Sequence, residues 1–430
     1  MKVLLINPSN NGMYPGSPPI SLAILASYLR QFGHELKIVD MASGQDYKNL
    51  EFSPDIVGIT GTTPTILDAY ECADYFKELG KRVIMGGAHV SVMPDEALAH
   101  ADWVVTGEGE LAFKIILEEI EKIPIDDEVN LKIKIKGTPI MDLDEIPMPA
   151  YDLLNMEFYL STPMAKLITC LPENLRMGCL LTSRGCPYHC TFCHNSFKNI
   201  PYRFNSAKRV VDEIEFLIDK YKIEALFFIE DNFFVNKERV KDVCNLMIER
   251  NIKIKWGGNA RVDNLDEETL ILAKKAGCIQ VTFGWESGSQ KMLDIYNKKT
   301  TVQQNEDSIK ICNNVGLMAN GTVMVGGPGE TIEDMQMTLD FIVNNHITGA
   351  VGVCATTPFP GTKMWEDLEK EGKIYPSYIN YREFNFSQIP VKCFDMPMSQ
   401  FMEILNKMRT IAGMRLTQSK LNYEIRKIKL

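Results

Sequence analysis

The most reactive feature of the sequence is a group of three cysteines near its middle, Cys186, Cys190 and Cys193, in the spacing C-x3-C-x2-C. Thiolates are the ligands that iron–sulfur clusters prefer, and a loop this short can place three of them on one face of a cluster. A cube of four irons that is held by three cysteines has one iron without a protein ligand. We therefore predict a 4Fe-4S site with an open iron, where a substrate or cofactor can bind.

Other roles for these cysteines remain as alternatives. Structural zinc normally takes four ligands, so His189 or His194 would have to supply the fourth. A disulfide set is disfavoured, because the chain shows no signal peptide and its remaining cysteines are scattered singly. Chance clustering is the last alternative, and the flanking Arg184, Gly185 and Pro187 count against it.

The chain has 430 residues, of which 45% are hydrophobic and 24% charged, and a formal net charge of −10. This composition is typical of a globular protein. This length exceeds what one hydrophobic core normally serves, so we expect two domains and an appendage. The acidic balance argues against a nucleic-acid partner. No stretch approaches the roughly 20 apolar residues of a membrane helix. Free cysteines suit a reducing cytoplasm, and an exposed cluster suits an anaerobic one.

Residues 1–122 alternate short apolar runs with segments of helical periodicity. Five such runs separated by helices predict an α/β domain with a doubly wound parallel sheet of the Rossmann-like, flavodoxin type. Ligands of such sheets bind beyond the carboxyl ends of the strands, where small residues let a large planar molecule approach the backbone. A domain that serves only as a scaffold is the alternative. The expected strands are residues 3–6, 35–39, 55–60, 82–85 and 102–105.

The β/α alternation resumes with a different cadence between residues 177 and 372. Six strand–helix pairs predict an open, partial (β/α)6 TIM-like barrel, whose chemistry collects at the carboxyl ends of the strands. Residues 123–176 are expected to be a linker that contains a short hairpin strand at residues 131–136. Residues 373–430 are expected to form a small C-terminal cap. The expected barrel strands are residues 180–183, 225–229, 253–257, 280–284, 320–325 and 350–355.

The cysteine loop, from Thr182 to Cys193, resembles the cluster-binding loop of the radical S-adenosylmethionine (radical SAM) superfamily. The signature of that loop includes an aromatic residue just before the last cysteine, here Phe192. The resemblance implies that S-adenosylmethionine chelates the open iron and that its reductive cleavage gives a 5'-deoxyadenosyl radical. It also places Phe192 over the adenine, whereas packing of this ring in the core is the alternative.

Charged residues at the ends of the predicted barrel strands complete this resemblance. A zwitterionic nucleoside needs a cation for its carboxylate, a carboxylate for its ammonium and an acceptor for its ribose hydroxyls. By position in the resembled barrel, Arg261 would bind the methionine carboxylate and Glu286 the ribose. Either Glu230 or Asp231 would bind the ammonium. The alternative is that these charges pair with one another at the barrel rim.

The first domain resembles the cobalamin-binding domain of one large radical SAM subfamily, class B methyltransferases included. The resemblance rests on residues 18–29, 33–36, 86–89 and 107–110. It implies that cobalamin binds at the carboxyl ends of the strands. The residues that would contact it are Thr60, Thr62, Gly86, Gly87, His89, Gly107, Glu108 and Gly109.

One departure concerns the lower axial ligand of cobalt. Residues 7–12, which follow the first strand, contain no histidine, and the pattern D-x-H-x-x-G of other cobalamin proteins is absent. We therefore expect cobalamin without a histidine ligand from this loop. His34 and His89 are the nearest alternatives, and each fits a surface or turn position better than a cobalt ligand.

Three functions agree with these features. The first is a cobalamin-dependent radical SAM methyltransferase that acts on an unactivated carbon or phosphorus centre. The second is a radical SAM enzyme of the same architecture that catalyses cyclisation, rearrangement or oxidation, with cobalamin as electron relay or absent. The third is a non-catalytic iron–sulfur binding or sensor protein, which would not need Arg261 and Glu286. Either enzyme requires an electron donor such as flavodoxin or ferredoxin, and a small-molecule, peptide or protein substrate.

Overall fold

The computed structural model describes residues 1–9, 17–122, 132–161, 167–172, 174–194, 200–376, 379–385 and 388–428, without the side chains of residues 418, 419 and 421–428. Part of the loop after the first strand and residues 123–131 of the expected linker lie outside this set. In the described part of the chain, no helix has both the length and the apolarity needed to cross a membrane.

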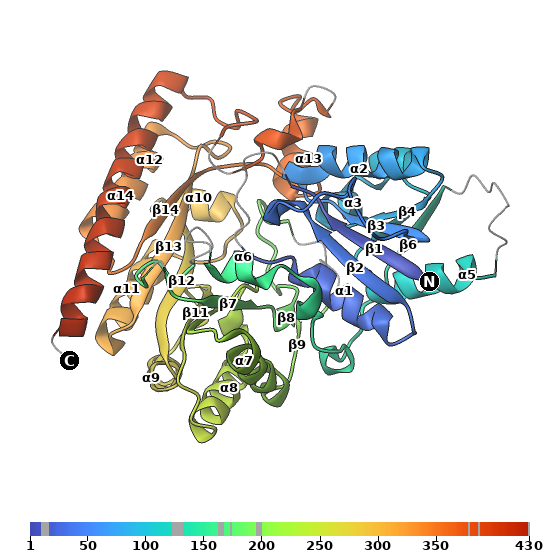
Figure 1. Ribbon diagram of the computed structural model, residues 1–430. Coiled ribbons are helices and arrows are strands. Elements are labelled where there is room, and N and C mark those ends of the chain that lie inside the picture. The colour runs from blue at the N-terminus through green and yellow to red at the C-terminus, as the bar shows by residue number, and fades with distance from the viewer. Residues whose placement is uncertain are drawn as a thin grey trace.

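The first domain is a doubly wound parallel sheet, as predicted (Figure 1). Alternate side chains of the first strand, β1, point to opposite faces of the sheet. Val3 and Leu5 pack under α1 and α5, whereas Leu4 and Ile6 pack under α2. The strand order is β2-β1-β3-β4-β5-β6. The strands are β1 (Lys2–Asn7), β2 (Glu35–Asp40), β3 (Ile56–Thr60), β4 (Arg82–Gly86), β5 (Trp103–Thr106) and β6 (Ile133–Lys136). The helices are α1 (Ile20–Arg30), α2 (Ile66–Glu78), α3 (Ala88–Val92), α4 (Pro94–His100) and α5 (Glu110–Ile120).

Strand β6 corrects one expectation. The hairpin predicted at residues 131–136 is wrong, because β6 pairs in parallel with β5, Trp103 opposite Ile133. Its alternation of lysine and isoleucine suits any half-exposed edge strand, so the pattern does not fix the direction of pairing. Lys134 reaches back to Asp95 at 2.7 Å on the surface of the same domain.

The second domain is an open barrel of six parallel strands in the order β14-β13-β12-β11-β10-β7. All its helices except α10 begin where a Ser, Asn, Asp or Thr side chain accepts an N–H of the first turn, as Ser206 does for α7 and Thr331 for α12. The strands are β7 (Met177–Leu180), β10 (Ala225–Phe228), β11 (Lys255–Ala260), β12 (Cys278–Glu286), β13 (Met318–Val325) and β14 (Val351–Ala355). The helices are α7 (Ala207–Tyr221), α8 (Lys237–Glu249), α9 (Glu267–Lys275), α10 (Gln290–Ile295), α11 (Val302–Val315), α12 (Ile332–Asn344) and α13 (Lys363–Lys370).

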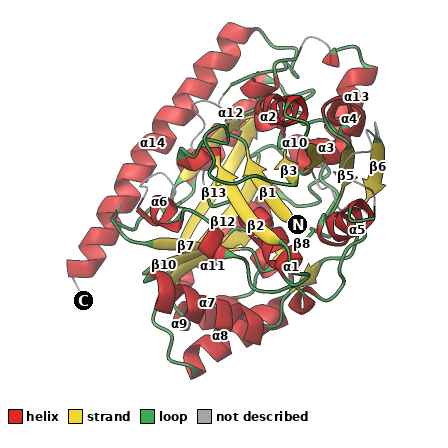
Figure 2. Cartoon of the chain, turned by 45° about the vertical axis from the view of Figure 1, so that its right-hand side comes forward, coloured by secondary structure: helices red, strands yellow, loops and turns green. Residues whose placement is uncertain are grey.

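The C-terminal region contacts both domains. Helix α14 (Met398–Ile428) lies against β14 and α12 and runs along one side of the molecule (Figure 2). The segment before it packs on the first domain, where Tyr381 meets the His89 ring edge-on at 4.7 Å between centroids and Arg382 lies 3.0 Å from Asp68. This region therefore ties the barrel to the sheet domain.

A buried ion cluster joins the two domains. Between β7 and α7, the strands β8 (Ser183–Arg184) and β9 (Arg203–Phe204) form a short antiparallel pair. Arg184 lies 3.0 Å from Glu108 and 2.6 Å from Glu110, and Arg203 also bonds to Glu108. The side chains of Glu108 and Arg203 are only 3% and 4% exposed, so each charge depends on its partners.

We expect Arg203→Met to lower the free energy of unfolding by about 3–5 kcal/mol, because it takes a partner from a buried carboxylate. The matched control is Arg30→Met, which breaks the exposed ion pair with Asp152 at 3.0 Å and should cost about 1 kcal/mol or less. Urea unfolding of the cofactor-free protein measures both. Equal losses would mean that the ion cluster adds no special stability.

The packing around Gly321 in β13 leaves no free space for a side chain. A Cβ there would lie 2.4 Å from the buried ring of Trp285, so Gly321→Ala should lower the free energy of unfolding by about 1–3 kcal/mol. Gly413→Ala is the control, since nothing lies within 4 Å of a Cβ on that exposed turn of α14, and alanine there should stabilise by about 1 kcal/mol. Thermal unfolding of the two variants, compared with wild type, gives the opposite signs if this packing is correct.

Candidate cofactor and active site

The cysteine loop leaves the barrel at the carboxyl end of β7 and is closed at its base by the β8–β9 pair. Gly185 opens the loop with a φ of 82°, a conformation that favours glycine. Within the loop the Cys193 N–H donates to the Cys190 carbonyl at 3.2 Å. The connection after α10 holds the loop from outside, because Asn297 donates to the His189 carbonyl at 2.7 Å and Thr191 N–H to the Tyr296 carbonyl at 2.9 Å.

None of the three cysteines forms a disulfide with a described residue, each is partly exposed, and their surroundings fit a cluster. Burial, followed by Asp231 and the other two cysteines, raises the pKa of Cys193 to about 12, and burial also raises the pKa of Cys186. Deprotonation here therefore needs the positive charge of bound iron. In the described residues no three His, Cys, Asp or Glu side chains converge closely enough to hold a single metal ion. Ligands of separate corners of a 4Fe-4S cube need no such convergence.

Arg261 lies beside this loop. Its guanidinium contacts the Cys190 sulfur at 3.7 Å and lies over the Tyr188 ring, 3.6 Å from the ring centroid. It also donates to the Asp263 carboxylate at 3.0 and 3.1 Å and to the Lys298 carbonyl at 2.7 Å. Arg261 is thus placed at the cluster, with Asp263 as its charge partner.

Glu286 ends strand β12 with a φ of 60°, which turns the chain away from the sheet. Its carboxylate accepts from Lys298 Nζ at 2.7 Å, and both side chains are buried. The alternative that the predicted rim charges pair with one another is not observed for Arg261 and Glu286, because each pairs with a residue outside the predicted set. Lys298 and Asp263, which sequence reasoning did not single out, are the partners. Asp263 follows the end of β11 closely, whereas Lys298 lies beyond α10, so only Asp263 had a signal in its distance from a strand end.

The two candidate acids after β10 point to different places. Glu230 is 2% exposed and accepts from the Thr182 N–H and hydroxyl at 2.9 and 3.0 Å, with Arg239 at 3.4 Å. Asp231 is exposed to the pocket, and partial desolvation there raises its pKa. The geometry favours Asp231 as the carboxylate that a ligand can reach.

Phe192 packs against the side of the site. Its ring meets Tyr296 edge-on at 5.5 Å between centroids and joins the apolar cluster under α2 and α13. It remains half-buried. Core packing of this ring is therefore observed, and a contact with adenine remains a prediction.

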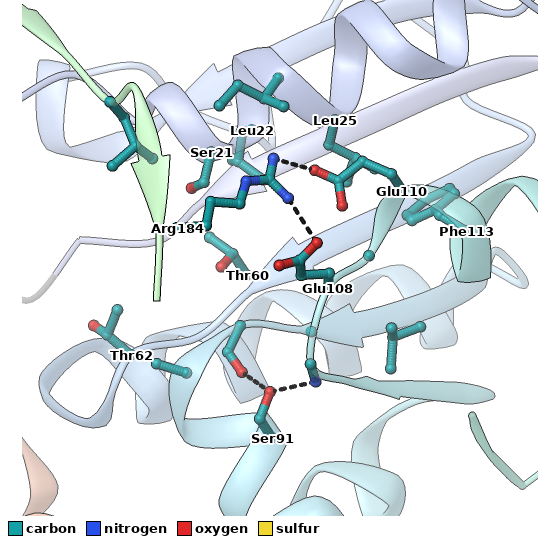
Figure 3. Close-up of a pocket in the computed structure, with 18 of the residues that line it drawn as sticks. Ser21, Leu22, Leu25, Thr60, Thr62, Ser91, Glu108, Glu110, Phe113 and Arg184 are labelled. Carbon is teal, nitrogen blue, oxygen red and sulfur yellow. Dashed lines mark hydrogen bonds and ion pairs between the residues drawn. The ribbon is translucent and has the colours of Figure 1, made fainter. Parts of the chain in front are cut away.

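A pocket of about 420 Å³ lies between the sheet domain and the cysteine loop (Figure 3). Seven of the eight residues predicted for cobalamin line it, together with Asp231 and the Ser183–Gly185 segment: Thr60, Thr62, Gly86, Gly87, Gly107, Glu108 and Gly109. Sequence reasoning missed the helical and barrel residues that complete the wall: Ser21, Leu22 and Leu25 of α1, Phe113 of α5 and Arg184. The pocket thus joins the two predicted cofactor sites.

His89 does not line this pocket, which corrects its predicted contact. The imidazole is fully buried, with Nδ1 3.1 Å from the Thr63 hydroxyl and Nε2 3.5 Å from Glu96. Gly87, with a φ of 102°, turns the chain into α3 so that His89 faces α4 and the C-terminal segment. His34 lies at the far end of β1, near the chain's amino terminus.

Another buried acid was missed in the loop after β13. Glu330 accepts from the N–H groups of Gly326 and Gly327, the latter at 2.9 Å. Burial raises the pKa of Glu330 to about 7, although the two hydrogen bonds act to lower it. The carboxyl group holds this glycine-rich turn at the barrel mouth.

Comparisons with known proteins agree with this geometry. Residues 180–342 match the sequence profile of the Radical SAM superfamily, and residues 14–117 match that of the B12 binding domain. The chain is 32% identical over 433 residues to an uncharacterized methyltransferase of Pyrococcus horikoshii, which covers 95% of this chain and 91% of that protein. It is 28% identical over 417 residues to the anaerobic magnesium-protoporphyrin IX monomethyl ester cyclase of Rubrivivax gelatinosus, covering 90% and 72% of the two chains.

Among solved structures, the fold is similar to that of the radical S-adenosylmethionine methyltransferase TsrM of Kitasatospora setae, which was solved with cobalamin and a [4Fe-4S] cluster bound. The TM-score is 0.69 at 20% identity, over 86% of this chain and 78% of that one. The order of the two profile matches is the domain order that the structure displays. The chain therefore belongs to the radical SAM superfamily, in the group whose barrel follows a B12-binding domain.

Proposed function

We propose that this protein is a cobalamin-dependent radical SAM methyltransferase that acts on an unactivated carbon. The observation that carries the proposal is the pocket between the domains. It is lined on one side by the glycine and threonine turns of the sheet and on the other by Ser183–Gly185 and Asp231, next to the cluster cysteines. A corrin held in this pocket faces the cluster loop directly.

The residues of the barrel mouth bind and orient S-adenosylmethionine in this proposal. The cluster supplies the electron that cleaves S-adenosylmethionine to a 5'-deoxyadenosyl radical, and the corrin supplies the methyl group. Cys186, Cys190 and Cys193 hold the cluster. Arg261 would bind the methionine carboxylate and Asp231 the ammonium, which is supported by the 3.7 Å contact of Arg261 with the Cys190 sulfur and by Asp231 in the pocket wall.

Two charge partners prepare this site before the nucleoside arrives. Asp263 keeps the guanidinium of Arg261 flat over Tyr188, and Lys298 fixes the carboxylate of Glu286, which accepts the ribose hydroxyls. Groups held in this way lose little freedom on binding. Phe192 shields the cluster side of the site from water.

The corrin pocket offers hydroxyl groups and close backbone approach. Thr60 and Thr62 line it, and Ser91 fixes the two turns by bonding the Gly107 N–H at 2.9 Å and the Gly87 carbonyl at 2.8 Å. Among the described residues that line the pocket there is no histidine. We therefore propose that cobalamin binds without a histidine below the cobalt.

The remaining parts of the proposal follow from this chemistry. A radical SAM enzyme needs a one-electron donor, and we propose a flavodoxin or ferredoxin in an anaerobic cytoplasm. The substrate is a small molecule or a peptide or protein side chain. A cyclase or oxidase of the same architecture is the alternative, and the relative from Rubrivivax gelatinosus carries a cyclase name. The methyltransferase is preferred because the full-length relative at 32% identity carries that name.

Anaerobic reconstitution tests the proposal. We expect about four irons, four sulfides and one corrin per chain, and conversion of S-adenosylmethionine to 5'-deoxyadenosine and S-adenosylhomocysteine under reducing conditions. Cys186→Ala, Cys190→Ala and Cys193→Ala should each lose most of the iron and all 5'-deoxyadenosine formation, because each removes one of three ligands.

Cys312→Ala is the matched control, since Cys312 is a buried thiol on α11 and should keep full iron content. Full iron content in these three cysteine variants would contradict the assignment of the loop. A wild-type protein that takes up the cluster but no corrin would remove the methyltransferase reading and leave the cyclase alternative.

A further inference from the structure

A second cavity, of about 470 Å³, lies inside the barrel. Its walls come from the inward-facing residues of β10 to β14, such as Phe227, Asn259, Thr282 and Thr322. Ile229, at the end of β10, lines both this cavity and the cofactor pocket. The barrel cavity therefore adjoins the place where the two cofactors meet, and its size is that of sites for small organic molecules.

Hydrogen bonds to the segment before β7 build the floor of this cavity. Gln280 accepts from the Thr169 N–H at 3.2 Å and donates to the Leu167 carbonyl at 2.9 Å. Asn320 donates to the Thr169 hydroxyl at 3.0 Å and accepts from the Ala350 N–H at 3.2 Å. These side chains are engaged with the protein, so the floor is fixed rather than adaptable.

The wall above the floor keeps spare hydrogen-bonding groups. The Thr282 hydroxyl accepts from Gln280 at 3.0 Å, so its own proton is left to donate. Asn259 uses one N–H for the Glu230 carbonyl at 3.0 Å, which leaves its amide oxygen. The hydroxyl of Thr322, whose backbone pairs within the sheet, has no hydrogen-bond partner among the described residues. All three side chains are only partly buried and border the cavity.

Charge separates this cavity from the cofactor pocket. The cofactor pocket is lined by Glu108, Glu110, Arg184 and Asp231, whereas none of the described side chains that line the barrel cavity is charged. A carboxylate or phosphate that entered the cavity would lose water and find no counter-charge on these walls, which is strongly unfavourable. A pure hydrocarbon would leave the amide and hydroxyl groups unpaired.

We propose that the barrel cavity binds the part of the substrate that receives the methyl group, and that this part is uncharged, carries hydrogen-bonding groups and has an apolar surface that packs on Phe227 and Ile229. This assignment rests on the proposed methyltransferase function. It excludes substrates whose reacting end is a free carboxylate or phosphate.

Two probes of equal shape and different charge, 2-naphthamide and 2-naphthoate, test the charge preference. Binding to the full chain with cluster and corrin loaded is measured by saturation-transfer NMR. We expect 2-naphthamide to bind at least tenfold more tightly than 2-naphthoate. Gly352→Leu should weaken 2-naphthamide at least tenfold, because a Cβ at Gly352 lies 3.1 Å from the Thr322 methyl and a longer side chain there fills the cavity.

Gly413→Leu, on an exposed turn of α14, is the control and should bind as wild type does. If Gly352→Leu does not fold, Thr322→Val replaces it, and a loss of at least threefold is expected. Equal or tighter binding of 2-naphthoate, no binding of either probe at millimolar concentration, or unchanged affinity in the folded cavity variant would overturn the proposal. Corrin content and 5'-deoxyadenosine formation, measured on the same samples, show separately whether the methyltransferase function holds.

Discussion

The interaction on which this structure depends is the buried contact of Glu108 with two arginines. Glu108 stands in the turn after β5, inside the stretch that lines the corrin pocket, whereas Arg184 and Arg203 stand on the pair of strands that closes the cysteine loop. A carboxylate with 3% exposure cannot keep its charge without partners, so the turn and the loop are held in one relative position. Two cofactors that bind to different domains therefore keep one separation.

The proposed nucleoside site follows the same physical rule on a smaller scale. Arg261 and Glu286 are buried charges, and each has a partner, Asp263 and Lys298. Neither pair has to break when a zwitterion arrives, because a guanidinium has five donors and a carboxylate about four acceptor positions. Pairing at the rim and ligand binding, which looked like alternatives in the sequence, are compatible in this geometry.

Local patterns predicted a large part of this protein. Apolar runs gave most strands of both sheets, although β7 lies three residues before the run expected there. Seven of the eight residues expected to contact cobalamin line one pocket, and the binding of cluster and corrin by the predicted residues stays a prediction. Two predictions, the pairing of β6 and the contact of His89, were wrong because they depend on tertiary packing. Strand β6 looked like a hairpin because its alternation is the same in either direction of pairing. His89 was expected to contact cobalamin because the sequence does not say which way a side chain points. Packing against α4 and Tyr381 decides that direction.

The floor of the barrel shows why such features escape a sequence. A six-stranded barrel does not close, and β7 and β14 are left as its edges. Residues of the connecting segment fill the interior near the gap, through bonds from Thr169 to Gln280, 111 residues away, and to Asn320, 151 residues away. A backbone segment inside the barrel needs hydrogen-bond partners, and only polar side chains of the strands can supply them. This explains why Gln280 and Asn320 stand where a closed barrel would carry branched apolar side chains. Asn320 also lines the cavity, so one of the amides that hold the segment gives the mostly apolar interior an uncharged polar group.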